Sequence, residues 1–271
     1  MSGEEEKQPQ NPLAVTHELL AKMKSLSAES EFCFGCHPGL SCWGECCRNP
    51  NLFLTPYDIL RLKNSLNLES GEFLEKYTEV YVGEDFGLPV VRIRLDEKGA
   101  CPFLGESGCK VYQDRPTSCR TYPIGQGVSS GTGKGDSQKV FFKVEEEYCL
   151  GWSQTAKWTV EKWLEDQGVF KYNQNNEYAV HLAFHPNLGE PGKMDQDTVA
   201  MIFMALSDLD RFRKFVLTSS FLQKFELEEG LVEKIKEDDE ALMALGQRWV
   251  SFFALGGMNA MTPKKPGKDK K

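Results

Sequence analysis

All nine cysteines of this 271-residue chain lie between residues 33 and 149. Five of them fall in the single run FCFGCHPGLSCWGECCR, at positions 33, 36, 42, 46 and 47. The other four follow at wider spacing, as Cys101, Cys109, Cys119 and Cys149. Cysteines confined to one segment indicate a shared site, and the leading hypothesis is that they ligate a metal or a metal cluster.

The N-terminal sequence and the net charge narrow the expected cellular location and partners. The start MSGEEEKQPQNP lacks the basic and apolar regions of a signal peptide, and no apolar stretch reaches the length of a membrane span. We therefore expect a cytoplasmic protein, where structural disulfides are rare, and the odd cysteine count excludes complete internal pairing. The net charge of -8 argues against a nucleic-acid partner, and we expect no membrane partner.

Composition and local patterns predict an α+β fold that is mainly helical, with an irregular cysteine-rich core, a small β-sheet and a helical C-terminal part. The expected organisation has a disordered start and a cysteine-cluster domain that contains a Gly/Ser loop. A helical region and a basic tail follow. The disordered start covers residues 1–12, and the cysteine-cluster domain covers residues 13–152, with its loop at 125–138. The helical region covers residues 153–262, and the basic tail covers residues 263–271.

Several segments carry recognisable signals. In LTPYDILRLKNSL, Thr55 is a good N-cap, Pro56 suits the first helical position and Asp58 follows three residues after the cap. The alternation in LPVVRIRL predicts a strand with Arg92 and Arg94 on one face. Further helices are expected over 12–26, 70–81 and 153–170, a strand over 139–149, and two or three amphipathic helices over 195–256.

Thiolates are soft ligands, and four of them complete a tetrahedral zinc site or hold one iron–sulfur cluster. Crowded anionic thiolates repel each other, so a bound cation or cluster makes such crowding tolerable. Arg115 and Arg120 flank Cys109 and Cys119, where a guanidinium group could offset residual negative charge at a cofactor. Equally, each arginine could pair with a carboxylate such as Asp114, and both interpretations remain open.

The downstream block CPFLGESGCKVYQDRPTSCRTYP resembles the second half of the YkgJ-like cysteine-cluster family, the zinc- or iron-chelating CxxCxxCC domain. The upstream half resembles a variant of that family in which a C-H-P-G run precedes C-x-x-x-C-C-R and L-T-P-Y-D. Its spacing departs from the strict CxxCxxCC pattern. The resemblance covers roughly residues 32–152, and its matching positions are Cys36, Cys42, Cys46, Cys47, Arg48, Thr55, Asp58, Cys101, Cys109, Tyr112, Arg115, Pro116, Cys119, Arg120, Pro123 and Cys149.

This resemblance implies eight metal ligands and leaves Cys33 over. Eight thiols would serve two four-thiolate sites, or one cluster with reserve thiols. The adjacent Cys46 and Cys47 favour two sites or one bridged assembly. Widely spaced single cysteines favour an iron–sulfur cluster, with [4Fe–4S] preferred, over zinc, although the family's name leaves the metal open. The implied ligands are Cys36, Cys42, Cys46, Cys47, Cys101, Cys109, Cys119 and Cys149.

Other motifs fail on inspection. The C-x-x-C-H pattern at 33–37 matches haem attachment, but that reaction occurs outside the cytoplasm. The radical S-adenosylmethionine pattern fails because Asn49 stands where a third cysteine belongs, and GTGKGDS lacks the spacing of a phosphate-binding loop. His181 and His185 do not form HExxH because Leu182 replaces the glutamate, so we expect a structural or surface role for both.

Three functional hypotheses follow. The first is an iron–sulfur carrier with a redox or electron-transfer role and a protein redox partner. The second is a zinc-stabilised scaffold. The third is a component of a protein-modifying enzyme with a protein substrate, since flagellin lysine N-methylases contain a similar cysteine cluster. No Gly-rich strand–loop for S-adenosylmethionine is present in the sequence, and whether the chain is an enzyme stays open.

Overall fold

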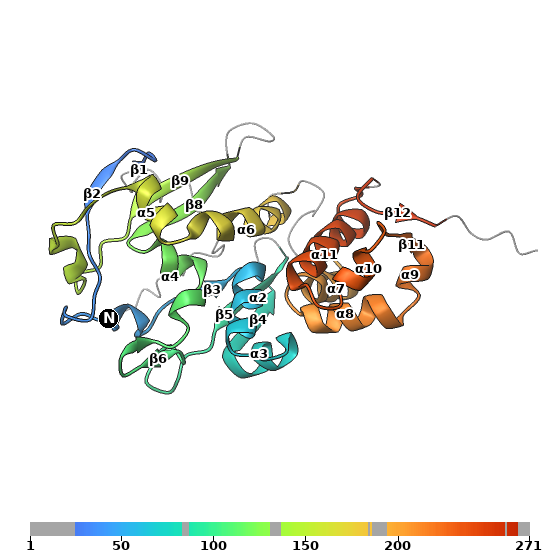
Figure 1. Ribbon diagram of the computed structural model, residues 1–271, viewed down its shortest axis with the longest axis horizontal. Coiled ribbons are helices and arrows are strands. Elements are labelled where there is room, and N and C mark those ends of the chain that lie inside the picture. Colours follow the sequence, from blue (N-terminus) through green and yellow to red (C-terminus); the bar gives the residue numbers. More distant parts are fainter. Residues whose placement is uncertain are drawn as a thin grey trace, which may run out of the picture.

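The computed structural model describes residues 25–82, 87–130, 137–183, 185, 194–257 and 259–264. It has a mixed α+β fold in which small antiparallel sheets accompany the helices, as the sequence predicts. Figure 1 shows an elongated molecule with two parts side by side. We call residues 25–183 the cysteine-bearing part and residues 194–264 the helical part. The expected disorder at 1–12, nearly all of the helix at 12–26 and the tail beyond 264 lie outside the described residues.

Helix α2 (Pro56–Ser65) begins as the sequence predicts. The Thr55 hydroxyl accepts a hydrogen bond from the Asp58 amide, and the Asp58 carboxylate accepts one from the Thr55 amide. This reciprocal capping satisfies two backbone donors that would otherwise lack partners. The helix buries Ile59 and Leu62 against the sheet formed by β3 (Phe53–Leu54), β5 (Pro89–Ile93) and β4 (Thr78–Val82).

The predicted helix over 70–81 is too long. Helix α3 (Ser70–Tyr77) ends where the Thr78 hydroxyl donates to the Leu74 carbonyl, 2.6 Å away. Residues 78–82 form strand β4 instead, antiparallel to β5, with Val80 opposite Val91. Pairing with a strand that lies later in the sequence therefore overrides the helical pattern. The predicted strand is confirmed as β5, with Arg92 on its more exposed face, but the strand ends at Ile93 and Arg94 lies one residue beyond it.

The predicted Gly/Ser loop over 125–138 is mostly strand. Residues Ile124–Ser130 form β8 and pair with β9 (Ser137–Lys143), leaving only 131–136 outside the described residues. Ile124 and Val128 are buried, which anchors the first strand of this hairpin. Gly125 is required there, because a Cβ atom would lie 2.1 Å from the Phe142 ring. The two-residue strand β1 (Ser25–Leu26) completes this sheet.

Strand β2 (Glu31–Cys33) pairs with β10 (Lys157–Thr159), so the chain on either side of the cysteine segment closes on itself. Part of the predicted helix over 153–170 is therefore strand, and helices α5 (Val160–Asp166) and α6 (Val169–Ala183) follow it. Phe32 and Phe34 pack with Trp163 and Val169 in one apolar cluster. Helix α5, at the start of the predicted 153–262 helical region, thus packs against residues that flank the cysteine run.

The helical part contains more helices than the two or three expected. The chain turns at Ser207 and Asp208, which separate α7 from α8, and a second turn at Ser219 and Ser220 separates α8 from α9. Trp249 lies at the centre of the core, with its ring centroid 5.6 Å from that of Phe212 and 5.1 Å from that of Phe215. The elements are α7 (Gln196–Leu206), α8 (Leu209–Thr218), α9 (Phe221–Lys224), β11 (Phe225–Glu226), α10 (Leu231–Lys234), α11 (Asp239–Ala254) and β12 (Thr262–Pro263).

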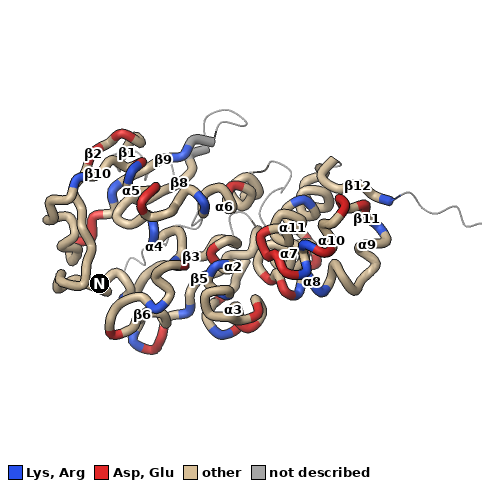
Figure 2. Tube along the Cα trace, viewed as in Figure 1, with Lys and Arg blue, Asp and Glu red and all other residues tan. Residues whose placement is uncertain are grey.

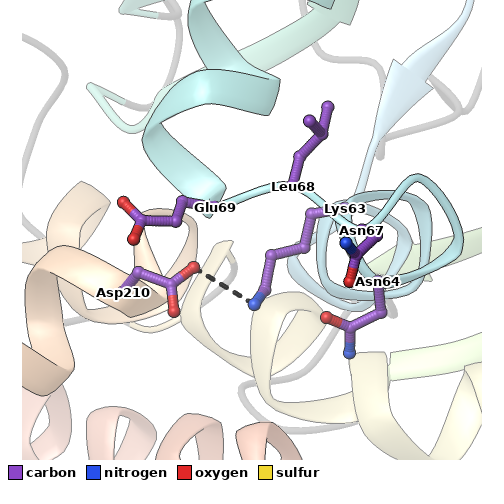
Figure 3. Close-up of a pocket in the computed structure, with 6 residues that line it drawn as sticks. All are labelled: Lys63, Asn64, Asn67, Leu68, Glu69 and Asp210. Carbon is purple, nitrogen blue, oxygen red and sulfur yellow. Dashed lines mark ion pairs between the residues drawn. The ribbon is translucent and has the colours of Figure 1, made fainter.

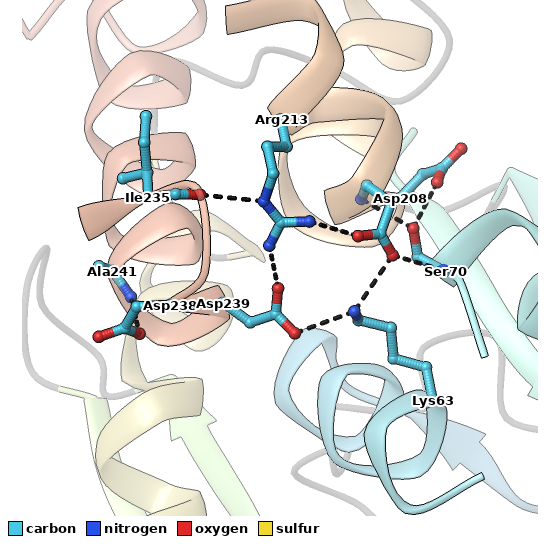
Figure 4. Close-up of polar contacts among 9 residues, drawn as sticks. Lys63, Ser70, Asp208, Arg213, Ile235, Asp238, Asp239 and Ala241 are labelled. Carbon is cyan, nitrogen blue, oxygen red and sulfur yellow. Dashed lines mark hydrogen bonds and ion pairs between the residues drawn. The ribbon is translucent and has the colours of Figure 1, made fainter. Parts of the chain in front are cut away.

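A buried ionic network joins the two parts. Lys63 of α2 is 5% exposed and lies 3.1 Å from an Asp210 carboxylate oxygen and 2.9 Å from one of Asp239. Arg213 contacts both carboxylates as well (Figure 4). Acidic residues accordingly gather where α8, α10 and α11 meet (Figure 2). Two carboxylates shared by two cations fix α2 against α8 and α11.

Within the described residues, no helix has both the length and the apolar character needed to cross a bilayer.

Candidate metal centre

The upstream cysteine run follows β2 as irregular chain and ends in a single 3-10 turn, Glu45–Cys47. Gly44 precedes this turn at φ 84°, in the left-handed region that glycine adopts without strain. Two backbone bonds hold the run against residues 151–156: Phe34 donates to the Ala156 carbonyl at 2.9 Å and Gly35 donates to that of Gly151 at 3.1 Å. The run is therefore anchored to a segment that follows Cys149.

The downstream cysteines lie against this same run. The Cys101 amide donates to the Cys47 carbonyl at 2.9 Å, and Arg48 forms an isolated β-bridge with Ala100. Cys109 is held opposite Leu104 by the two short strands β6 (Leu104–Gly105) and β7 (Gly108–Cys109). Residues more than fifty positions apart thus meet, which brings the two halves of the cysteine set together.

Cys119 is placed by helix α4 (Thr117–Thr121), whose start is tied to α2. The Asp58 carboxylate accepts hydrogen bonds from the Thr117 amide at 2.8 Å and the Thr117 hydroxyl at 2.7 Å. Asp58 is fully buried, and burial raises its pKa despite the bonds from Thr55 and Thr117. A single carboxylate therefore links the L-T-P-Y-D and R-P-T-S-C motifs.

Four cysteines line one small cavity of about 40 Å³. Cys36 and Cys46 are exposed there, whereas Cys42 and Cys149 are half-buried. The Leu150 amide lies 3.3 Å from the Cys42 sulfur and donates to it. We call these four residues the outer thiol group. The cavity is lined by Cys36, Leu40, Cys42, Gly44, Cys46, Tyr122, Tyr148, Cys149 and Gly151.

Two tyrosines complete the cavity wall. The Tyr122 hydroxyl is buried and makes no hydrogen bond within normal limits among the described residues, although it lies close enough to the Cys149 thiol to interact with it. Burial, followed by Cys149, raises the pKa of Tyr122. Buried hydroxyls without partners are rare in folded proteins, and this one belongs to a cavity-lining residue, where it could donate to the Cys149 sulfur once that thiol is ionised.

Three of the remaining four predicted ligands pack against a hydrophobic core cluster, and the fourth, Cys119, keeps exposed surface on α4. Cys101 is buried, and Cys47 and Cys109 pack with it against Phe103 and Val111. Cys119 influences Cys101, Cys109 and Cys47 electrostatically. We call Cys47, Cys101, Cys109 and Cys119 the inner thiol group.

Thiol pKa values reflect this crowding. Burial first, and then the neighbouring thiols Cys46, Cys149 and Cys42, raise the pKa of Cys36 to about 11. Burial likewise raises the pKa of Cys101, Cys109 and Cys119; Cys119 has exposed residue surface, but many protein atoms surround its sulfur. A hydrogen bond from Cys47 lowers the pKa of Cys46 to about 7. Without a bound cation, most of these thiols therefore stay protonated at neutral pH.

The two arginines expected near a cofactor have different surroundings. Arg120 is buried and donates to the carbonyls of Arg115, Gln167 and Gln113, while its guanidinium lies over the Tyr172 ring at 4.2 Å. Arg115 lies 4.0 Å over the Tyr112 ring, and its positive charge offsets part of the burial-driven rise in the pKa of Cys36 and Cys109.

Asp114, the carboxylate suggested as an alternative partner for these arginines, is paired with Arg61 instead. Arg115 therefore affects the thiols through its charge, whereas Arg120 braces the loop around α4.

The donor set suits a soft metal or a cluster, because eight thiols lie in two adjoining groups and none is in a disulfide. As they stand, no three Cys, His, Asp or Glu side chains in the described ranges are placed to hold one ion. A change between staggered χ1 rotamers moves a cysteine sulfur by about 3 Å. Ligation at either group therefore requires the thiols to turn inward.

A larger cavity, of about 470 Å³, lies at the junction of the two parts and contains no cysteine. Figure 3 shows Lys63 and Asp210 facing each other across it. Its charged groups already serve the ionic network of Figure 4. The smaller cavity remains the stronger candidate site, because its lining carries reactive ligands. The larger one is lined by Lys63, Asn64, Asn67, Leu68, Glu69 and Asp210.

Comparison with known families supports this choice. Residues 35–150 match the family described as CxxCxxCC: Putative zinc- or iron-chelating domain. The match confirms the resemblance read from the motifs, and zinc or iron chelation is the property in the family's description. The matched CxxCxxCC segment begins after Cys33 and contains the other eight cysteines. No solved structure matches the chain.

The sequence motifs did not point to Tyr122, Tyr148 or the Leu150 amide as parts of the site. The available signal was their position, since Tyr148 and Leu150 flank Cys149 and Tyr122 follows Cys119 by three residues. The structural role of Asp58 in placing Cys119 also required the fold, because the two residues lie on different helices.

Proposed function

We propose that the CxxCxxCC segment binds an iron–sulfur cluster, with [4Fe–4S] favoured, and carries electrons to or from a protein partner. The main support is that eight free thiols from separate segments lie near one turn, the turn that contains Cys46 and Cys47. Four of the eight thiols would hold such a cluster. The candidate ligands are Cys36, Cys42, Cys46, Cys47, Cys101, Cys109, Cys119 and Cys149. A bound cluster would supply one-electron redox chemistry.

Two features support a cluster over zinc. Cys101, Cys109, Cys119 and Cys149 come singly, from a loop, a hairpin, a helix and a loop, rather than as the paired knuckles usual for structural zinc. The Leu150 amide donates to the Cys42 sulfur, and hydrogen bonds to sulfur ligands are one way in which proteins tune the reduction potential of a cluster.

The chain's own residues would exclude water and hold the ligands. Phe103 and Val111 cover the inner thiol group on its apolar side. Tyr122 supplies a buried hydroxyl at the outer group, and Arg115 supplies positive charge near Cys36 and Cys109. Asp58 keeps α4, and hence Cys119, in place.

The direct test is anaerobic purification followed by a visible spectrum and assays for iron, sulfide and zinc. A brown protein with a broad band near about 400 nm and matching iron and sulfide supports the proposal. Colourless protein with stoichiometric zinc contradicts it. That result would support the zinc-stabilised scaffold, in which the metal supplies folding free energy alone.

A further inference from the structure

We infer that the eight thiols form two metal sites with different roles: the inner thiol group binds a metal that holds the fold, and the outer thiol group binds one that exchanges with the surroundings. This inference rests on the proposed metal binding, but it does not depend on which metal is bound. It assigns a different role to each of the two thiol groups.

The adjacent residues Cys46 and Cys47 divide the set. Cys46 is exposed and lines the small cavity with Cys36, Cys42 and Cys149. Cys47 packs against the apolar cluster that contains Cys101, and its carbonyl accepts the Cys101 amide. The two side chains also hydrogen-bond to each other, so the groups adjoin at this turn. Assigning Cys46 to the cavity and Cys47 to the apolar cluster gives four thiols on each side.

Three members of the inner thiol group, Cys47, Cys101 and Cys109, belong to a hydrophobic core cluster, whereas Cys119 keeps exposed surface at α4. Cys101 is 8% exposed, and the surrounding cluster includes Ile59 of α2, Ile93 of β5 and Phe103, all nearly inaccessible to solvent. Strands of two residues, such as β3, β6 and β7, are too short to be stable alone. A metal that joins β7, α4 and the 3-10 turn would therefore cross-link short elements from three separate parts of the sequence.

The outer thiol group lies at the surface. Cys36 and Cys46 are exposed, and Tyr148 and Leu150, which flank Cys149, are 44% and 43% exposed. The upstream ligands Cys36 and Cys42 belong to irregular chain between β2 and the 3-10 turn. Thiols on such chain can leave and re-form bonds to a metal without disturbing any buried cluster.

The two sites should therefore release metal at different rates. Release from the inner group requires the apolar cluster to open, whereas release from the outer group requires only local movement. Core regions open with free energies several kcal/mol above those of surface segments, which corresponds to a rate difference of at least about 100-fold. The outer metal should leave first and the inner metal should leave as the cysteine-bearing part unfolds.

The test uses the full chain loaded with zinc alone. A chromophoric chelator in excess is added, and zinc release is followed together with alkylation of each cysteine by a maleimide, mapped by mass spectrometry. We expect two phases, each of one zinc per chain. Cys36, Cys42, Cys46 and Cys149 should become alkylated in the fast phase, and Cys47, Cys101, Cys109 and Cys119 only in the slow phase. Cys33 should label at once and serves as the internal control.

Paired variants sharpen the assignment. Cys36→Ser with Cys149→Ser should abolish the fast phase and leave the slow one unchanged. Cys101→Ser with Cys109→Ser should abolish the slow phase. If that second variant does not fold, the alkylation order in the unmodified chain still decides the question.

A single phase, one zinc per chain, or mixed alkylation of the two groups would overturn the division while leaving metal binding intact. A chain that binds neither zinc nor a cluster would overturn the proposed function and this inference together.

Discussion

The helical part and the cysteine-bearing part are stabilised in different ways. In the helical part, α7, α8 and α11 enclose a core in which Trp249 contacts several phenylalanines. The cysteine-bearing part has sheets of two or three strands, some only two residues long, and its thiols lie among the smaller apolar clusters. The cysteines themselves lie mostly on loops, two-residue strands and one short helix, so metal binding there would also serve folding.

The largest expected effect separates Cys119 from Cys33. Cys119→Ser should lose metal and destabilise the cysteine-bearing part, because structural zinc contributes on the order of 10 kcal/mol to the folding of small domains. Cys33→Ser should retain both metal and stability, since Cys33 lies outside both thiol groups. Metal analysis and thermal unfolding check this pair. Equal metal loss in the two variants would contradict the assignment of eight ligands and one bystander.

The next effect concerns the helical part alone. Trp249→Ala removes a side chain that is 6% exposed and surrounded by phenylalanines, so we expect a loss of about 4 kcal/mol in unfolding free energy. Metal content should not change. Phe170→Ala is the matched control, because that ring is 48% exposed and its removal should change stability by less than about 0.5 kcal/mol. Metal loss in Trp249→Ala would show that the two parts depend on each other.

The smallest effect is at the junction and depends on pH. Burial alone would raise the pKa of Asp210, but the Ser70 amide, Lys63 and Arg213 hold it below its ordinary value; the pKa of Asp239 is also lowered. A carboxyl whose pKa is lowered on folding stabilises the fold above its unfolded pKa of about 3.9, and this contribution is lost as the pH falls through the folded pKa.

Urea unfolding of the full chain, followed by far-ultraviolet circular dichroism between pH 6 and pH 3 (about the range of Asp titration), should therefore show stability falling with acid. Asp210→Asn with Asp239→Asn should flatten that decline, and the difference between the two curves cancels any effect of metal release. Parallel curves would contradict the role of these carboxylates.

Local signals predicted a substantial part of the fold. Thr55, Pro56 and Asp58 specify the start of α2 because capping involves residues within one helical turn. The strand β5 follows from alternation alone. The errors came from long-range pairing, since the strand character of 78–82 depends on β5 and that of 124–130 depends on β9. The breaks between α7, α8 and α9 also escaped the apolar pattern, which continues across them.

The sequence gives candidate ligands, and that assignment stays a prediction, but it gives no arrangement for them. The motifs named eight cysteines, and the CxxCxxCC match contains all of them. Which thiols share a cavity depends on the direction in which Cys46 and Cys47 project from one turn, and sequence spacing does not encode that direction. Tyr122 escaped notice for the same reason, because its hydroxyl is significant only where the chain brings it close to Cys149.

Hydrogen–deuterium exchange on the full chain, with metal bound and after its removal under anaerobic conditions, tests the central claim most directly. The account predicts that amides in the 3-10 turn, β6, β7 and α4 lose protection when metal is removed, while those of α7, α8 and α11 keep theirs. Unchanged protection around the cysteines would contradict the claim that a metal holds this part of the fold.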